Sequence, residues 1–188
     1  MFIKNHTICA VLFVCCFLYN VDSVLAIENI THKNYSETAS ILADVSNRGS
    51  RIVASELYSD PEKWNLVLRN IATGTALWLK VAVALHSGSD ATISEMLSLA
   101  VGEALEKSPA NVFRITLPVF QLKFICGGPD VDDSRYDSYE RTIEAIKRRQ
   151  NKVSSLADPE LTKVGLLCIQ ALEASKEGLV KFYGIKKK

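Results

Sequence analysis

The chain has 188 residues, of which 48% are hydrophobic and 23% are charged, an ordinary composition for one globular domain with a core. Its formal net charge of +1 excludes the strongly basic surface of a protein that binds nucleic acid. No low-complexity linker divides the sequence, so a single domain is predicted.

The N-terminal segment has the order of features that is typical of a secretory signal. An apolar run of about a dozen residues follows Lys4, whereas a membrane-spanning helix needs roughly 20. Val24 and Ala26 are small residues at the positions that signal peptidase reads. We therefore predict a cleaved signal peptide over residues 1–26 and one periplasmic or secreted domain over residues 27–188. No membrane span is expected after cleavage.

Three helices are predicted in the first half of the mature domain. Apolar residues recur at helical spacing over Tyr35–Leu57, with Gly49 weakening the middle. A helix that begins with proline and contains Trp64 follows. The stretch "ALWLKVAVAL", Ala76–Leu85, is apolar nearly all round and predicts a central buried helix. We expect Trp78 to be buried there, and Trp64, near a helix start, to be partly exposed.

The second half continues the helical pattern. A clean apolar stripe predicts a helix over Ile93–Leu105, and the next helix, from Pro109, is kinked or split by Pro118. A further amphipathic helix is predicted from about Asp133 to Leu156. The last helix begins after an Asp-Pro pair and places Cys168 on its apolar face.

These elements predict an all-α fold with one disulfide and about six to seven helices, arranged as a single-domain irregular helical bundle or as a short HEAT-like helix stack. Pro61, Pro109 and Pro159 each begin a helix, and their spacing lies near the period of two-helix HEAT-type repeats. The alternative is that Ser-Pro and Asp-Pro are simply frequent helix starts.

Only two cysteines, Cys126 and Cys168, remain once the signal peptide is removed. In an oxidising compartment they have one possible pairing, and such a crosslink contributes about 2–4 kcal/mol to stability. Two separate buried thiols are the alternative. A catalytic thiol would need a neighbouring base, and the mature chain has only His32, in a polar lead-in, and His86, at a helix end.

The segment "GGPDVDDSRY", which follows Cys126, combines a turn with three aspartates. An EF-hand that began at Asp130 would have arginines where the loop requires glycine and glutamate, so a calcium loop is excluded. Tyrosine and arginine are favoured interface anchors, and acidic residues steer a protein toward a basic cleft. The predicted partner-binding residues are Asp130, Asp132, Asp133, Arg135 and Tyr136. The alternative is a solvated connection with a good helix cap.

The sequence has no HExxH, paired CxxC, GxSxG or glycine-rich phosphate loop, so we expect no catalytic set, no metal site and no cofactor. A helical glycan hydrolase that uses two of the glutamates is the enzymatic alternative. The glutamates considered for it are Glu37, Glu56, Glu95 and Glu103. Glutamates on amphipathic helices are, however, typical of solvated faces.

A cleavable signal, an all-α mature domain of this size and few cysteines forming a late disulfide together make a recognisable architecture. It resembles the small periplasmic immunity proteins that Gram-negative bacteria keep against secreted cell-wall-degrading effectors, including type VI amidase effectors. The resemblance covers the whole chain but includes no motif, so it transfers no binding residue. It implies a protein that binds an effector tightly, blocks its active-site cleft and often forms a homodimer. An envelope scaffold or assembly factor would share the same binding physics.

Overall fold

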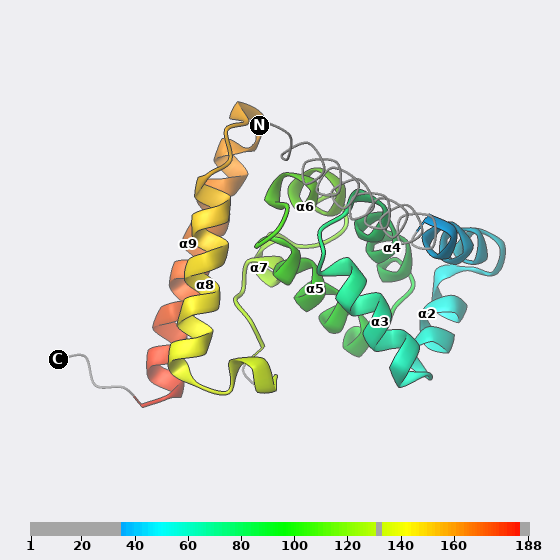
Figure 1. Cartoon of the computed structure of the whole chain (residues 1–188), viewed down its shortest axis with the longest axis horizontal. Helices are drawn as coiled ribbons and strands as arrows, with labels where there is room; N and C mark the ends of the chain where they lie inside the picture. The colour runs from blue at the N-terminus through cyan, green and yellow to red at the C-terminus, as the bar shows by residue number, and fades with distance from the viewer. Residues whose placement is uncertain (1–34, 131–132, 185–188) are drawn as a thin grey trace, which may run out of the picture. The chain divides into compact units, whose positions relative to one another are not determined.

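A computed structural model describes residues 35–130 and 133–184 (Figure 1). The predicted signal peptide, His32 and Asp132 lie outside these residues, so the predictions about them stay predictions. The chain divides into one unit over residues 1–40 and a second over residues 41–188. In the first unit the described residues, 35–40, are helical. Everything below concerns the second unit.

All regular secondary structure in the described residues is helical, which confirms the all-α class. Residues 41–48 are helical. The complete α-helices that follow are α2 (Ser50–Tyr58), α3 (Pro61–Ile71), α4 (Ala76–His86), α5 (Ala91–Ala104), α6 (Pro109–Thr116), α7 (Leu122–Ile125), α8 (Tyr139–Ser154) and α9 (Pro159–Phe182). A 3-10 helix, η1 (Ser134–Tyr136), precedes α8. The described part of the chain therefore has more helices than the six to seven predicted.

The additional helices arise where longer predicted helices are divided. Gly49 has φ 88°, a left-handed conformation that separates residues 41–48 from α2. Pro118 lies in the turn between α6 and α7, so it splits the predicted helix. Ser138, rather than Asp133, caps α8, because the shorter η1 occupies the residues before it. Breaks of this kind leave the apolar periodicity intact and change only the number of helices.

The described helices from α2 to α7 alternate between two layers. α4 packs against α2 and α6, and α5 packs against α3 and α7. Figure 1 shows two oblique rows, one with α6, α4 and α2 and the other with α7, α5 and α3. Pro61 begins α3 and Pro109 begins α6, which lie in different rows. The spacing of the prolines therefore does not follow the pairing of the helices.

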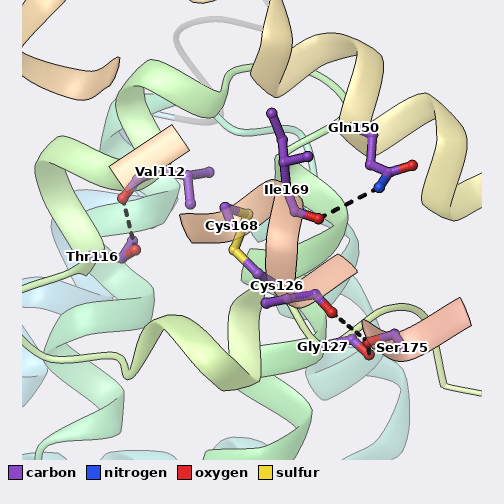
Figure 2. Close-up of a disulfide and its surroundings, with 9 residues drawn as sticks. Val112, Thr116, Cys126, Gly127, Gln150, Cys168, Ile169 and Ser175 are labelled. Carbon is purple, nitrogen blue, oxygen red and sulfur yellow. Dashed lines mark hydrogen bonds between the residues drawn. A yellow bond between two sulfur atoms is a disulfide. The ribbon is translucent and has the colours of Figure 1, made fainter. Parts of the chain in front are cut away.

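The last two helices form a hairpin, and α9 also contacts α6 and α7. The link to α7 is covalent: Cys126 and Cys168 form a disulfide with a Cα–Cα distance of 5.3 Å (Figure 2). The predicted crosslink is therefore confirmed, and the alternative of two separate thiols is wrong. Both cysteines are fully buried.

The core is densest along α4, where Trp78, Leu79 and Leu85 are buried as predicted. Trp64 is also buried, with 2% of its surface exposed, so the expectation of a partly exposed ring is wrong. Its ring packs edge-on against Tyr58, and its indole N–H donates a hydrogen bond to Met96 Sδ at 3.3 Å. Among the described residues, no helix is long and apolar enough to cross a membrane.

Candidate functional site

A cavity of about 390 Å³ lies where α3, α5, α8 and the segment after α7 meet. Its charged lining residues are Arg69 from α3, Glu103 from α5, Arg149 from α8, and Asp130, Asp133 and Arg135 from the segment. Three of the five predicted partner-binding residues thus line one cavity. Asp132 falls outside the described residues. The prediction that these residues contact a partner stays a prediction.

Arg135 forms the rim of this cavity and is held by two carboxylates. Its Nη1 and Nη2 donate hydrogen bonds to Glu103 Oε2 and Oε1, at 2.9 and 2.6 Å. Its Nε and Nη2 also donate to Asp133, and this hydrogen bonding holds the pKa of the Asp133 carboxyl below its usual range. Paired charge-assisted hydrogen bonds of this kind fix the orientation of a guanidinium. The segment after α7 is therefore tied to α5.

Tyr136 has a different role from the one predicted. The sequence suggested an exposed anchor, but only 8% of Tyr136 is exposed, and burial raises the pKa of its hydroxyl. Its carbonyl oxygen accepts a hydrogen bond from Thr142 Oγ1 at 3.0 Å, which joins η1 to α8. The Arg135 guanidinium carbon lies 5.4 Å from the ring centroid. Tyr136 is therefore a buried residue of η1 and not an exposed anchor.

Arg149 is the site residue that the sequence analysis missed. It lies on α8 with 1% of its side chain exposed, and burial lowers the pKa of its guanidinium. Glu106 Oε1 is 3.7 Å from its Nε, too far for a hydrogen bond. Nε and Nη2 have no hydrogen-bond acceptor among the described residues. A buried cation with two unpaired donors is unusual, because such donors are normally satisfied.

The position of Arg149 within the apolar stripe of α8 could have identified it from the sequence. The buried residues of α8 include Thr142, Ile146, Arg149 and Val153, which recur at helical spacing. An arginine in the apolar stripe of an amphipathic helix departs from the pattern and therefore suggests a specific role. The exposed side of this region carries ion pairs between residues four positions apart. One of them joins Arg141 Nη1 to Asp137 Oδ1 at 2.9 Å.

Gly102 on α5 makes room for this arrangement. A Cβ atom built at Gly102 would lie 2.7 Å from the carbonyl oxygen of Ile125 and 3.5 Å from Arg149 Nη1. The first distance is too short for any side chain, because the contact is with backbone that cannot rotate away. The absence of a side chain at Gly102 therefore lets α7 approach α5 closely, next to the buried guanidinium.

The residues considered for catalysis are placed elsewhere or are engaged. His86 is half-buried against Phe120, with ring centroids 4.3 Å apart, and burial lowers its pKa. Glu103 is bound by Arg135 and Glu56 by Arg48. Both described cysteines are in the disulfide. Within residues 35–130 and 133–184, no group of three or more histidine, cysteine, aspartate or glutamate side chains is placed to hold a metal ion.

Comparison with known proteins adds no relative. No family model matches the chain, and neither a curated protein nor a solved structure matches it significantly. The resemblance to periplasmic immunity proteins therefore stays a prediction. The functional interpretation rests on the cavity and on the segment that borders it.

Proposed function

We propose that this chain is an exported helical binding protein that neutralises a secreted cell-wall-targeting effector by occluding its active site. The contact surface is the rim of the cavity, built from Asp130, Asp133 and Arg135. The observation that carries this proposal is the double pairing of Arg135, which holds an exposed guanidinium in one position between Glu103 and Asp133.

A surface that is fixed before binding loses little conformational freedom when a partner docks. The segment that carries the rim is anchored at its start by the Cys126–Cys168 disulfide. At its end, the hydroxyl of Ser138 accepts a hydrogen bond from the backbone N–H of Arg141 and caps α8. Glu103 holds the middle through Arg135. These three anchors support a contact surface at Asp133 and Arg135 that is ordered before binding.

The chemistry of the rim suits recognition of a charged cleft. Arginine is enriched among the residues that dominate binding energy, and the flanking carboxylates attract a basic partner and accelerate association. More than half of the Arg135 side chain is exposed, so it is accessible to a partner. The disulfide supports export, because such bonds form and persist in oxidising compartments.

The test is an inhibition assay with a cell-wall-degrading effector encoded next to this gene. Purified effector is mixed with peptidoglycan and increasing amounts of the protein, and the release of fragments is measured. We expect wild-type protein to suppress release and the double variant D130N/R135Q to require about 10-fold more protein, which corresponds to a loss of about 1.4 kcal/mol. Suppression by the variant at wild-type concentrations would show that the rim is not the contact surface.

The matched control is D137N/R141Q, which makes the same two changes of residue type at an exposed aspartate–arginine pair at the start of α8, away from the cavity lining. It should inhibit like wild type. Thermal unfolding of both variants verifies that they are folded. Two outcomes contradict the proposal: release of fragments by the protein alone indicates a hydrolase, and binding without inhibition indicates a scaffold.

A further inference from the structure

The two unpaired donors of Arg149 lie next to each other on the guanidinium. Nε and Nη2 form one edge of the group, and their N–H bonds point in the same direction. This edge binds a carboxylate through two parallel hydrogen bonds, one to each oxygen. The buried side chain therefore presents an unused site for a single carboxylate where it lines the cavity.

Among residues 35–130 and 133–184, no carboxylate completes this pair. Glu106 is the carboxylate in ion-pair distance of Arg149, but its Oε1 remains 3.7 Å from Nε. Its other oxygen, Oε2, accepts a hydrogen bond from Arg148 Nε at 2.9 Å, which holds Glu106 toward the exposed side of α8. Glu103 is bound on both oxygens by Arg135. An incompletely paired buried charge is costly, so an additional anion would be stabilising.

We propose that the cavity binds one carboxylate group, which accepts hydrogen bonds from Nε and Nη2 of Arg149. The carboxylate comes either from a free organic acid or from an acidic side chain of a protein partner. In the second case the inference deepens the proposed function and rests on it. The cavity volume of about 390 Å³ lies at the small end of ligand pockets and suits a short acid or one side chain.

The charges of the lining favour a monoanion over a phosphate. The three carboxylates of the lining, Asp130, Asp133 and Glu103, balance the charges of its three arginines, so the cavity offers a dianion no net positive charge. Arg69 is exposed on α3 and adds one positive charge to the lining. Nε and Nη2 are shielded from solvent, so a carboxylate reaches them only after the lining of the cavity rearranges. Association should therefore be slower than the diffusion limit.

The experiment follows the Nε–H signal of Arg149 by NMR in ¹⁵N-labelled full-length mature protein. The signal is assigned by its loss in R149K, which keeps a positive charge but lacks the two-donor edge. Acetate, butyrate, a blocked glutamate (N-acetylglutamate amide) and inorganic phosphate are titrated separately at constant ionic strength. We expect the carboxylates to produce a saturable shift of the Nε–H signal. The affinity for phosphate should be lower than that for the carboxylates by about 10-fold or more.

The control variant is R114K, because Arg114 pairs with Asp158 in an exposed position and does not line the cavity. Carboxylate binding, followed by isothermal titration calorimetry, should be unchanged in R114K and lost in R149K. Binding retained by R149K, tighter binding of phosphate, or no saturable shift would each overturn the proposal. A further outcome would also overturn it. If the Nε–H signal of the free protein already has the position of a carboxylate-bound group and loses it in E106Q, Glu106 occupies the site.

The titrations also separate the two sources. Equal binding of butyrate and blocked glutamate supports a free acid as sufficient ligand, whereas preference for blocked glutamate supports an acidic side chain of a partner. Neither titration contains the effector. If the protein binds carboxylates but does not inhibit the effector, only the proposed function is contradicted. If it inhibits the effector but does not bind carboxylates, only this inference is contradicted.

Discussion

The hydroxyl of Ser175 on α9 donates a 2.7 Å hydrogen bond to the carbonyl oxygen of Gly127, the residue that follows Cys126 (Figure 2). Ser175 lies two turns beyond Cys168, on the same side of the helix. One face of α9 therefore holds the end of α7 twice, by a covalent bond and by a hydrogen bond. The segment that borders the cavity starts from this fixed point.

The first prediction concerns the disulfide. The two cysteines are 42 residues apart, and a crosslink over a loop of this size restricts the unfolded chain and contributes about 2–4 kcal/mol. We expect reduction to lower the free energy of unfolding by that amount in a denaturant titration. The C126A/C168A variant should show a loss of at least this size and no further response to reductant. Equal stability with and without reductant would contradict the prediction.

A second prediction concerns Trp78 in the middle of the core. Trp78 is 2% exposed, so Trp78→Ala should lower the free energy of unfolding by about 3–5 kcal/mol, because it leaves a cavity. Trp78→Phe should be much milder, since the indole nitrogen has no hydrogen-bond partner among the described residues. Chemical denaturation measures both. Leu167 is exposed, so Leu167→Ala serves as the control and should change stability by less than about 0.5 kcal/mol.

The apolar periodicity predicted the helical class and the buried α4, because burial of one helix face is recorded in the spacing of residues. It did not predict where helices stop. Gly49 is compatible with a continuous but weakened helix, and only its left-handed backbone in the structure separates the two segments. Trp64 was misjudged for a similar reason. Proximity to a helix start does not reveal that Tyr58 and Met96 cover the ring.

The candidate site was predicted in part. The composition of the segment after Cys126 pointed to Asp130, Asp133 and Arg135, which line the cavity. The other half of the cavity lining comes from α3, α5 and α8. These helices meet only through tertiary contacts, which a local sequence pattern does not record. The pairing of Arg135 with Glu103 joins residues far apart in the sequence, so no local pattern records it. Arg149 was the exception, because an arginine in an apolar stripe is visible in the sequence.

The third prediction is a pH dependence of stability through His86. Burial lowers the pKa of His86 in the folded protein, while the unfolded chain keeps a value of about 6.5. Below about pH 6.5 the unfolded chain therefore binds more protons, and the stability present at neutral pH falls as the pH decreases. We expect H86Q to show a smaller loss of thermal stability between about pH 7.5 and about pH 5.5 than wild type. An identical loss in both proteins would assign the pH dependence to other groups.

The last prediction compares two glycines inside helices, Gly102 in α5 and Gly178 in α9. Alanine favours a helix over glycine by about 0.5–1 kcal/mol, so either substitution is stabilising where space permits. A Cβ atom at Gly178 meets nothing within 4 Å, and Gly178→Ala should raise the free energy of unfolding by about that amount. A Cβ atom at Gly102 would lie 2.7 Å from the Ile125 carbonyl oxygen, so α7 must move away from α5.

We therefore expect Gly102→Ala to lower the free energy of unfolding by about 1–3 kcal/mol, the usual effect of overpacking. Because the same Cβ atom lies 3.5 Å from Arg149 Nη1, the substitution should also shift the NMR signal of Arg149 Nε–H, while Gly178→Ala leaves that signal in place. Denaturant titrations and the NMR spectrum of each variant measure the two effects. Equal stabilisation by both substitutions would show that α5 and α7 are not packed through Gly102.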